Sequence, residues 1–361
     1  MPAQKITADC IWSSFRTSGK RHLLLTGSRG SGKTTMLNAL CPEPLPGVTT
    51  WADPGKAVYL RENGTGREAA IGLFNFACPG VHNKMRPLSY GFAALGVPAL
   101  QRCLHDPSPW VRIDEIGYLE LGCREYCQAL EQLFDTKQVL AVVRKQDAPL
   151  LNGLLHREDA FVIDLDAPTG NAGCVIMASG LGRRFGGSKL LTPFLGKPML
   201  FWALDATEGL FSHRVVVTRS EAAAEACRSR GVETVLHDMP GRNDTVRLGL
   251  EAVGAVERCL FCPADQPLLS RQTVASLLLC GQNSHGLIWR PCLQETPGAP
   301  ILFPRDYFEE LKQLPQGKGG GYVAASHGEN VRTLPVADGR ELRDIDTPEN
   351  LMNLEQMARQ M

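Results

Sequence analysis

The sequence has no long apolar run and no excess of charge of either sign. No segment approaches the roughly 18 to 20 apolar residues that a membrane-spanning helix needs, and residues 1–15 lack the basic-then-apolar pattern of a secretion signal. The 38 Lys and Arg residues balance the 38 Asp and Glu residues, so no overall field attracts the protein to nucleic acid or to an anionic membrane. These absences predict a cytoplasmic protein that binds neither nucleic acid nor a membrane.

The 12 cysteines are scattered along the chain and lack the spacing of a zinc site. Two close pairs, Cys123/Cys127 and Cys259/Cys262, have no second Cys or His pair at zinc spacing. A chain of this length can also bury its own core without disulfides. The cysteines are therefore predicted to be reduced, structural thiols.

The length and the pattern of elements predict two domains. At about 100 to 200 residues per domain, 361 residues exceed what one core usually organises. The small, turn-forming residues of 166–173 separate two apolar segments, which places the domains at 1–168 and 173–361. Strands alternate with helices on both sides of this boundary. This pattern predicts two doubly wound α/β domains, each with a mainly parallel sheet.

The first domain contains a glycine-rich phosphate-binding motif. Residues 27–34 read GSRGSGKT, which fits G-x4-G-K-[ST], and they lie between an expected strand at 22–26 and an expected helix at 34–40. Glycines let backbone N–H groups turn toward a phosphate, the lysine reaches the outer phosphates, and the Thr hydroxyl reaches Mg²⁺. The residues predicted to bind nucleotide here are Gly27, Gly30, Gly32, Lys33, Thr34 and Thr35.

An acidic motif at the end of another expected strand complements this loop. Residues 114–120 read DEIGYLE. Asp114 is predicted to hold Mg²⁺ together with Thr34, and Glu115 is the candidate that activates the attacking water. The alternative is an ordinary solvated pair of acids, which the nearby phosphate loop makes less favourable.

These two motifs resemble those of a family of small P-loop nucleoside triphosphatases whose second motif reads D-E-I-G-x-M-E. Leu119 stands at the usual Met, and the similarity spans roughly residues 20 to 165, including the GVTT segment at 47–50. The resemblance implies a P-loop NTPase fold and Mg²⁺-dependent hydrolysis of ATP or GTP. It does not indicate what the hydrolysis drives.

A second glycine loop opens the other domain. Residues 174–189 read CVIMASGLGRRFGGSK, and three residues instead of two precede the third glycine, which fits a nicotinamide site poorly. A loop that wraps a triphosphate fits better, because Arg184 and Lys189 could neutralise charge when the α-phosphate is attacked and pyrophosphate leaves. Solvated surface cations are the alternative. The predicted catalytic cations are Arg184 and Lys189, and the predicted nucleotide-binding residues are Ala178, Ser179, Gly180 and Gly182.

Two carboxylates are the candidate metal ligands of this domain. Asp265 follows an apolar strand at 258–262, at the sheet edge where α/β proteins bind ligands. It is predicted to act in catalysis as a Mg²⁺ ligand. Asp346 is a candidate second ligand, although the segment Asp346-Thr-Pro-Glu is also an ordinary helix N-cap.

These motifs resemble the MobA-like nucleotidyltransferase family, with the greatest similarity to its molybdenum cofactor cytidylyltransferase branch. Arg184, Phe185, Gly186 and Lys189 match the opening motif, and 241–249 resembles the segment near base and ribose, which assigns Thr245 to nucleotide binding. The resemblance covers about residues 173 to 355. It implies a Rossmann-like nucleotidyltransferase fold, transfer of CMP from CTP to molybdopterin cofactor, and a molybdenum hydroxylase as client.

Three alternatives remain at this point. The second domain could use GTP, or act on a sugar phosphate, because the loop binds the triphosphate and not the acceptor. The chain could also be a non-catalytic carrier of the cofactor that is switched by nucleotide. In addition, the segment GKGGG at 317–321 lacks the acidic residue that the family often carries there.

Overall fold

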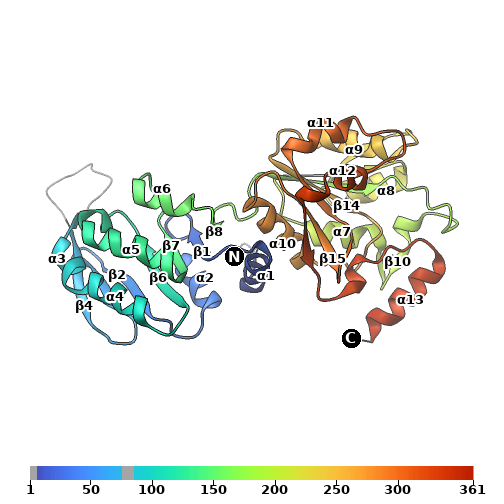
Figure 1. The fold of residues 1–361 in the computed structure, drawn as a ribbon. Coiled ribbons are helices and arrows are strands. Elements are labelled where there is room, and N and C mark those ends of the chain that lie inside the picture. Colours follow the sequence, from blue (N-terminus) through green and yellow to red (C-terminus); the bar gives the residue numbers. More distant parts are fainter. Residues whose placement is uncertain (1–5, 75–84, 361) are drawn as a thin grey trace. The chain divides into compact units, whose positions relative to one another are not determined.

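The computed structural model describes residues 6–74 and 85–360, and its chain forms two compact units (Figure 1). One unit is Ser18–Pro168. The other is Thr169–Met361 together with the segment that ends at Thr17. The prediction of a first domain at 1–168 is therefore corrected at its start. Within the described residues, no helix combines the length and the apolar character needed to cross a membrane.

The correction follows from the packing of helix α1 (Ala8–Ser18). Its Cys10, Ile11, Ser14 and Phe15 are buried, and the Ser14 hydroxyl donates to the carbonyl oxygen of Ser276 in the same unit, 3.3 Å away. A helix here is hard to predict from the sequence, because a polar residue, Ser14, lies at the centre of the buried face and interrupts its apolar pattern.

The unit Ser18–Pro168 is built on an eight-stranded sheet with the order β5-β4-β3-β2-β6-β7-β1-β8. The five strands from β2 to β8 in this order run parallel, as predicted, whereas β3, β4 and β5 extend the sheet in antiparallel pairs. The strands are β1 (His22–Thr26), β2 (Gly47–Asp53), β3 (Ala57–Glu62), β4 (Glu68–Phe74), β5 (Met85–Pro87), β6 (Trp110–Ile116), β7 (Gln138–Val143) and β8 (Ala160–Asp164).

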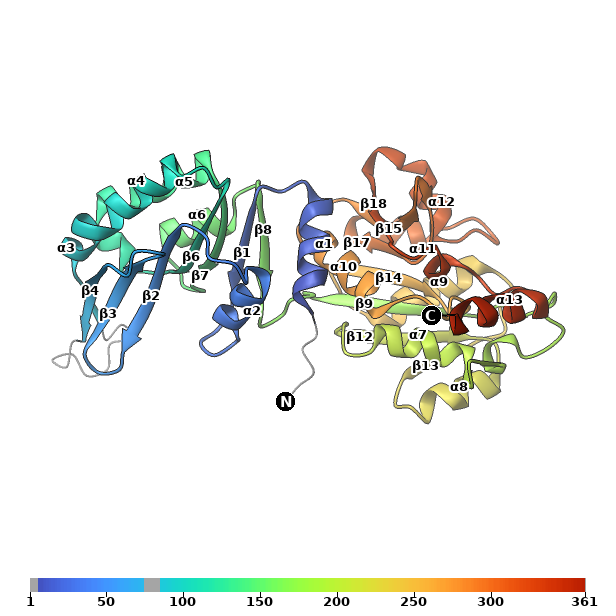
Figure 2. The ribbon, with the colours of Figure 1, turned by 90° about the horizontal axis from the view of Figure 1, so that it is seen from below.

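Helices cover both faces of this sheet (Figure 2). Alternate residues of β7 point to opposite faces, and Val139, Ala141 and Val143 join the core beneath α4, α5 and α6. Helix α2 lies on the other face (Figure 2). The helices are α2 (Lys33–Leu40), α3 (Ser89–Gly91) with the π-helical turn Phe92–Gly96, α4 (Val97–His105), α5 (Arg124–Thr136) and α6 (Pro149–Leu155).

The other unit has a mixed sheet with the order β13-β12-β9-β14-β17-β15-β16, and β18 pairs with β15. The first four strands are parallel, but β17 is antiparallel to both of its neighbours. The prediction of a mainly parallel sheet holds for that first half. The strands are β9 (Ala172–Ala178), β12 (His213–Thr218), β13 (Glu233–Leu236), β14 (Arg258–Pro263), β15 (Ile288–Leu293), β16 (Thr296–Pro297), β17 (Ile301–Pro304) and β18 (Val331–Pro335), with β10 (Pro193–Phe194) and β11 (Lys197–Pro198) forming a separate ribbon.

Helices pack against both faces of this sheet. Helices α9 and α11 cover one face of the sheet, and α7 and α10, which contact each other, cover the opposite face. A smaller core forms around Phe194, Met199, Ile345 and Leu354, and Phe185 packs against it. The helices are α7 (Met199–Thr207), α8 (Glu221–Arg228), α9 (Arg242–Val253), α10 (Arg271–Gln282), α11 (Phe308–Lys312), α12 (Gly320–Ser326) and α13 (Pro348–Arg359).

Two candidate nucleotide sites

The first glycine loop has a backbone that only glycine adopts at low cost. It connects β1 to α2, and Gly27, Gly30 and Gly32 have φ angles of 140°, 83° and 89°. A Cβ atom on Gly27 would lie 2.7 Å from the Ser31 hydroxyl oxygen. These glycines therefore allow the turn in which backbone N–H groups can face a phosphate.

Lys33 lies across this loop. Its Nζ donates to the carbonyl oxygens of Gly27 (3.0 Å) and Ser28 (2.6 Å). Burial lowers the pKa of Lys33, and the charge of Arg144 adds to this effect, whereas Asp166 opposes it. Asp166 also binds the loop directly, accepting from the Ser28 backbone N–H (2.8 Å) and hydroxyl (2.7 Å). In the sequence, Asp166 stands out only as part of the domain boundary, and no local pattern predicts its contact with Ser28, 138 residues earlier.

The two predicted metal ligands of this unit meet. The Thr34 hydroxyl donates to Asp114 Oδ1 at 3.3 Å, while Thr35 is exposed on α2. Asp114 is 5% exposed, and burial raises its pKa, although Arg112, with Nη2 3.6 Å from Oδ2, opposes the rise. A carboxylate and a hydroxyl are donors that Mg²⁺ accepts, with phosphate oxygens and water as its remaining ligands.

Glu115 lies in an unusual backbone conformation beside Asp114. Its φ is 82°, a left-handed value that costs free energy for a residue with a Cβ, and the pairing of β6 with β7 shifts between Ile113 and Ile116. The bulge turns Glu115 out of the strand alternation. Arg144 binds its carboxylate. Backbone strain of this kind concentrates at functional sites.

Glu120 is the last residue of the acidic motif, and the sequence alone does not predict a function for it. It is 3% exposed, and its carboxylate accepts from the backbone N–H of Gly117 (2.9 Å). Burial raises the pKa of Glu120 to about 7. The buried carboxyl group therefore ties down the turn that follows Glu115.

The second glycine loop leaves β9 and returns at the short turn that begins with Lys189. Gly182 and Gly186 have φ angles of 56° and 80°. A Cβ atom on Gly182 would lie 2.8 Å from the Gly187 carbonyl oxygen and 3.2 Å from Lys189 Cβ. The loop therefore closes on itself at Gly182, and Phe185 anchors it in the small core.

Lys189 brings together three segments that are far apart in the sequence. Its Nζ donates to Asp265 Oδ2 (2.7 Å) and to Asp346 Oδ1 (2.9 Å), and Arg184 Nη1 lies 3.7 Å from Asp346 Oδ2. Burial disfavours the charged form of Lys189, but the two carboxylates outweigh it and raise its pKa. The hydrogen bond from Lys189 lowers the pKa of Asp346. The four predicted residues thus form one charged cluster, with Lys189 between the carboxylates.

The packing around Ile345 explains how Asp346 reaches the cluster. Ile345 is buried, and its N–H donates to the Asp265 carbonyl oxygen at 3.0 Å. Helix α13 is capped by Thr347, whose hydroxyl accepts from the Asn350 N–H at 3.1 Å. The N-cap interpretation therefore applies to Thr347, and the Asp346 carboxylate is available for another role.

The two carboxylates suit a divalent cation. They share one cation already, the Lys189 ammonium group, and Mg²⁺ on nucleotides typically takes one or two carboxylates with phosphate oxygens and water. Among residues 6–74 and 85–360, no group of three or more His, Cys, Asp or Glu side chains forms a closed metal site. An open, oxygen-rich site shared with a nucleotide fits this arrangement.

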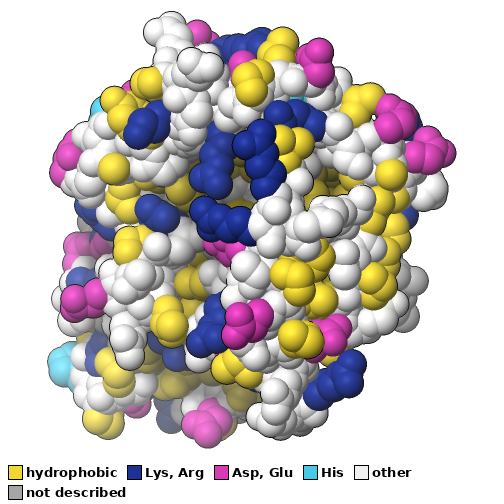
Figure 3. Space-filling model, turned by 90° about the vertical axis from the view of Figure 1, so that its right-hand side faces the viewer, with side chains coloured by type: hydrophobic (Ala, Val, Ile, Leu, Met, Phe, Trp, Pro, Cys, Tyr) yellow, Lys and Arg dark blue, Asp and Glu magenta, His cyan; other side chains and the backbone are white. Residues whose placement is uncertain are grey.

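A pocket of about 260 Å³ adjoins the loop. Ala178, Gly180 and Lys189 line it from the loop side, and Arg219 and Ser220 line it from the end of β12. Arg219 donates from Nε to the Ser179 carbonyl oxygen at 3.0 Å. No sequence motif pointed to this residue. The face of the molecule in Figure 3 carries Lys and Arg side chains around a hollow.

Three predicted nucleotide-binding residues, Ser179, Gly182 and Thr245, do not line this pocket. The Ser179 hydroxyl lies 3.1 Å from the Val217 carbonyl oxygen and 2.8 Å from His237 Nε2. Thr245 is 2% exposed within α9. The side chains of Ser179 and Thr245 therefore contribute to the protein interior around the loop.

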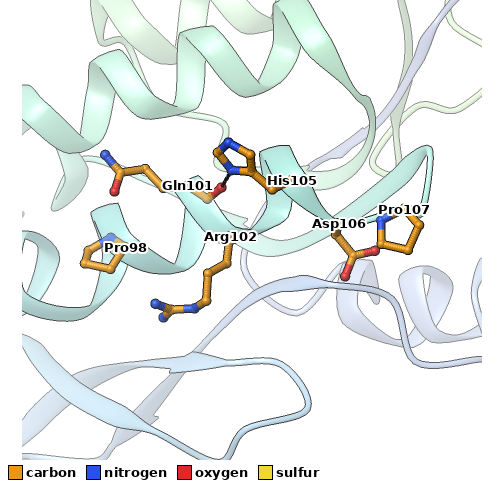
Figure 4. Close-up of a pocket in the computed structure, with 6 residues that line it drawn as sticks. All are labelled: Pro98, Gln101, Arg102, His105, Asp106 and Pro107. Atoms are coloured by element: carbon orange, nitrogen blue, oxygen red, sulfur yellow. Dashed lines mark hydrogen bonds between the residues drawn. The ribbon is translucent and has the colours of Figure 1, made fainter.

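A separate surface hollow of about 580 Å³ lies along α4 in the unit Ser18–Pro168 (Figure 4). His105 Nδ1 lies 2.9 Å from the Gln101 carbonyl oxygen one turn earlier. None of the predicted site residues lines this hollow, whose lining is Pro98, Gln101, Arg102, His105, Asp106 and Pro107.

Fold and residues together define an enzyme with two nucleotide-handling domains, and comparison with known families agrees. Residues 75–172 match the NTPase family, and residues 174–331 match the MobA-like NTP transferase domain. The chain therefore carries an NTPase domain followed by a MobA-like NTP transferase domain.

Individual relatives match one half of the chain each. The nucleoside-triphosphatase THEP1 from Thermotoga sp. (strain RQ2) is 26% identical over 156 residues, which are 42% of this chain and 89% of that protein. Among solved structures, Rv0371c from Mycobacterium tuberculosis H37Rv has 25% identity and a TM-score of 0.46, covering 52% of this chain and 98% of that one. Molybdopterin-guanine dinucleotide biosynthesis protein A from Archaeoglobus fulgidus has 22% identity and a TM-score of 0.43, covering 52% and 100%.

Proposed function

We propose that the transferase domain transfers CMP from CTP to molybdopterin cofactor with release of pyrophosphate, and that the NTPase domain hydrolyses ATP or GTP. The observation that carries the first assignment is the convergence of Lys189, Asp265 and Asp346 beside a glycine loop. A molybdenum hydroxylase is the proposed client that receives the finished cofactor.

The transfer requires no nucleophilic side chain. A terminal phosphate oxygen of molybdopterin bonds to the α-phosphorus of CTP, the bond to the bridging oxygen breaks, and pyrophosphate leaves with the electron pair. Arg184 and Lys189 neutralise the charge that develops on the triphosphate. Asp265 and Asp346 would hold Mg²⁺, which supplies charge neutralisation and orients the phosphates when bound.

Hydrolysis in the NTPase domain also depends on holding the reacting groups in place and neutralising the charge of the phosphates. The loop N–H groups and Lys33 hold the β- and γ-phosphates, and Asp114 and Thr34 would hold Mg²⁺. Glu115 accepts the proton of the attacking water.

The choice of CTP rests on two short segments. The tripeptide Asp265-Gln-Pro267 favours the cytidylyl branch of the family, and the guanylyl enzymes usually carry paired glycines where Ala178 and Ser179 stand. The Ser179 hydroxyl lies 2.8 Å from Nε2 of His237, directly after β13, so a glycine at position 179 would lose this contact.

The decisive experiment incubates the full chain and Mg²⁺ with molybdopterin and each α-labelled nucleoside triphosphate in turn. The proposal expects label from CTP on molybdopterin, release of pyrophosphate, and near-complete loss of both in an Asp265→Asn variant. Transfer of label from GTP instead of CTP would show that the transferase domain uses GTP, and the assignment of CTP would be wrong. Label on sugar phosphates in a parallel panel, with none on molybdopterin, would reject the acceptor.

The same variant separates an enzyme from a carrier. A carrier has no need of a metal carboxylate at the sheet edge, so Asp265→Asn would then still support maturation of the client in cells. The matched control is Asp306→Asn, which changes an acidic residue in the turn after β17, outside the charged cluster.

A further inference from the structure

We propose that Arg144 senses the γ-phosphate in the NTPase domain: it binds the Glu115 carboxylate, and a nucleoside triphosphate draws it away so that Glu115 becomes free to accept the proton of water. This inference rests on the hydrolysis proposed above for that domain. No motif in the sequence pointed to Arg144.

The structure fixes the base of the Arg144 side chain firmly. Arg144 directly follows β7, and its backbone N–H donates to the Ile116 carbonyl oxygen at 2.9 Å. Its stem lies against Gly117, where a Cβ atom would come within 3.0 Å of Arg144 Cδ. The Arg144 side chain as a whole is 42% exposed, and it binds the carboxylate of Glu115 through Nε. The stem is thus held while the charged head can change its partner.

The pair of Arg144 with Glu115 lies beside the phosphate-binding loop, because Asp114 directly precedes Glu115 and accepts from the Thr34 hydroxyl at 3.3 Å. The charge of Arg144 contributes to the lowered pKa of Lys33. Burial lowers the pKa of Arg144 itself, and the charge of Arg29 in the loop lowers it further. The charges of Arg144, Arg29 and Lys33 therefore act on one another at this end of the loop.

The pair of Arg144 with Glu115 conflicts with the role of Glu115 as a base. While the Glu115 carboxylate accepts from the guanidinium N–H, that side of the carboxylate is occupied and water cannot bind there in position to transfer its proton. A terminal phosphate carries more negative charge than one carboxylate and forms stronger charge-assisted hydrogen bonds with arginine. Exchange of the partner therefore neutralises charge on the phosphate and frees the Glu115 carboxylate to bind water in one movement.

The hydrolysis then balances with groups already present. The water oxygen bonds to the γ-phosphorus, the bond to the β–γ bridging oxygen breaks, and Glu115 takes the proton that water loses. The products are a nucleoside diphosphate and inorganic phosphate. A diphosphate has no γ-phosphate, so it leaves Arg144 on Glu115.

A double-mutant cycle in the full chain tests the exchange. The measurements are calorimetric affinities for ADP and for a non-hydrolysable ATP analogue, both with Mg²⁺. Because Glu115 competes for Arg144, Glu115→Ala is expected to bind the analogue about 10-fold more tightly, with ADP affinity unchanged. Arg144→Ala is expected to weaken the analogue about 10-fold and to slow hydrolysis at least as much. The double variant is expected to lose the gain of Glu115→Ala. Arg61→Ala, which removes a cation on β3 that pairs with Glu68, is the control.

Each contrary result has a distinct meaning. If the wild-type chain hydrolyses ATP or GTP but Glu115→Ala brings no gain, or the gain persists without Arg144, the exchange is rejected. If Arg144→Ala loses ADP binding as well, Arg144 is a structural residue and the exchange is also rejected. If no nucleotide is hydrolysed although the gain depends on Arg144, the sensing stands and the proposed hydrolysis fails.

Discussion

The two glycine loops of this protein are both candidate sites for a triphosphate, but their lysines are positioned by different contacts. In the first loop, the lysine belongs to the loop itself, and its contacts are with carbonyl oxygens five and six residues earlier. In the second, Lys189 contacts carboxylates that lie 76 and 157 residues later in the chain. The first site is formed mainly by one short segment, to which strand β6 contributes Asp114. The second site forms only when distant segments of the domain have packed together.

This difference determines what each site depends on. A local loop keeps its shape through glycine dihedrals and one helix. A site assembled from distant segments depends on the packing that positions them, here the small core beneath α13 that holds Phe185 and Ile345. The two sites should therefore respond differently to changes inside and outside their immediate surroundings.

The largest expected effect separates the two sites by chemistry. Lys33→Ala removes the cation that holds the outer phosphates, and hydrolysis is expected to fall by on the order of 10²- to 10³-fold. Nucleotidyl transfer should stay within about twofold of the wild type, because Lys189 and its partners are untouched. Phosphate release and pyrophosphate release, measured on one preparation, check both halves. An equal loss of transfer would contradict the independence of the two sites.

The next effect concerns a buried residue that belongs to neither site. Ile11 is fully buried in α1 on the transferase unit, so Ile11→Ala is expected to cost that unit about 2 to 5 kcal/mol. Hydrogen exchange should accelerate in β9 and β14 and stay unchanged in β1 and β7. Asp9→Ala, on the exposed side of α1, is the control. Faster exchange in β1 and β7 alone would show that α1 stabilises the NTPase domain and not the transferase unit.

The same difference explains how much the sequence could predict. Strand β1 and helix α2 flank the first loop where its motif places them, because the glycine pattern and the apolar run are contiguous. Asp114 and Asp265 were also expected at their places near the ends of apolar strands, and the pairs Thr34/Asp114 and Asp265/Asp346, which the sequence predicted as metal ligands, do lie together. The cap at Thr347 could not be separated from Asp346 by sequence, because Asp and Thr are both good N-caps.

Other features required long-range packing that no local pattern encodes. Helix α1 joins the unit after the boundary, the contact of Asp166 with Ser28 spans 138 residues, and Arg144 reaches Glu115 only because β7 lies beside β6. The antiparallel strand β17 also interrupts a sheet whose first strands are parallel. These features depend on which elements become neighbours, and side-chain periodicity reports only which face of an element is buried.

The local site contains a buried acid whose titration can be followed. Burial raises the pKa of Glu120 from 4.5 to about 7. Between these values the folded protein keeps a proton that the unfolded chain loses, so the free energy of unfolding of this unit falls as pH rises from 4.5 to 7. The total is roughly 3 kcal/mol at about 1.4 kcal/mol per pKa unit. Urea unfolding at several pH values should show a smaller fall in Glu120→Gln. Glu131→Gln, exposed on α5, should behave as wild type, and an identical pH dependence in Glu120→Gln would contradict the assignment.

The smallest effect tests whether helix capping and metal binding at the start of α13 are separate. Thr347→Ala removes the side-chain oxygen that accepts from the Asn350 N–H, which typically costs about 1 kcal/mol. Because the Asp346 carboxylate is held by Lys189 and not by the cap, transfer should persist under conditions in which α13 stays folded. Asp346→Asn should give the reverse, with stability retained and transfer lost. If both substitutions abolish transfer and destabilise the domain alike, Asp346 acts only through the helix, and the second site has a single carboxylate.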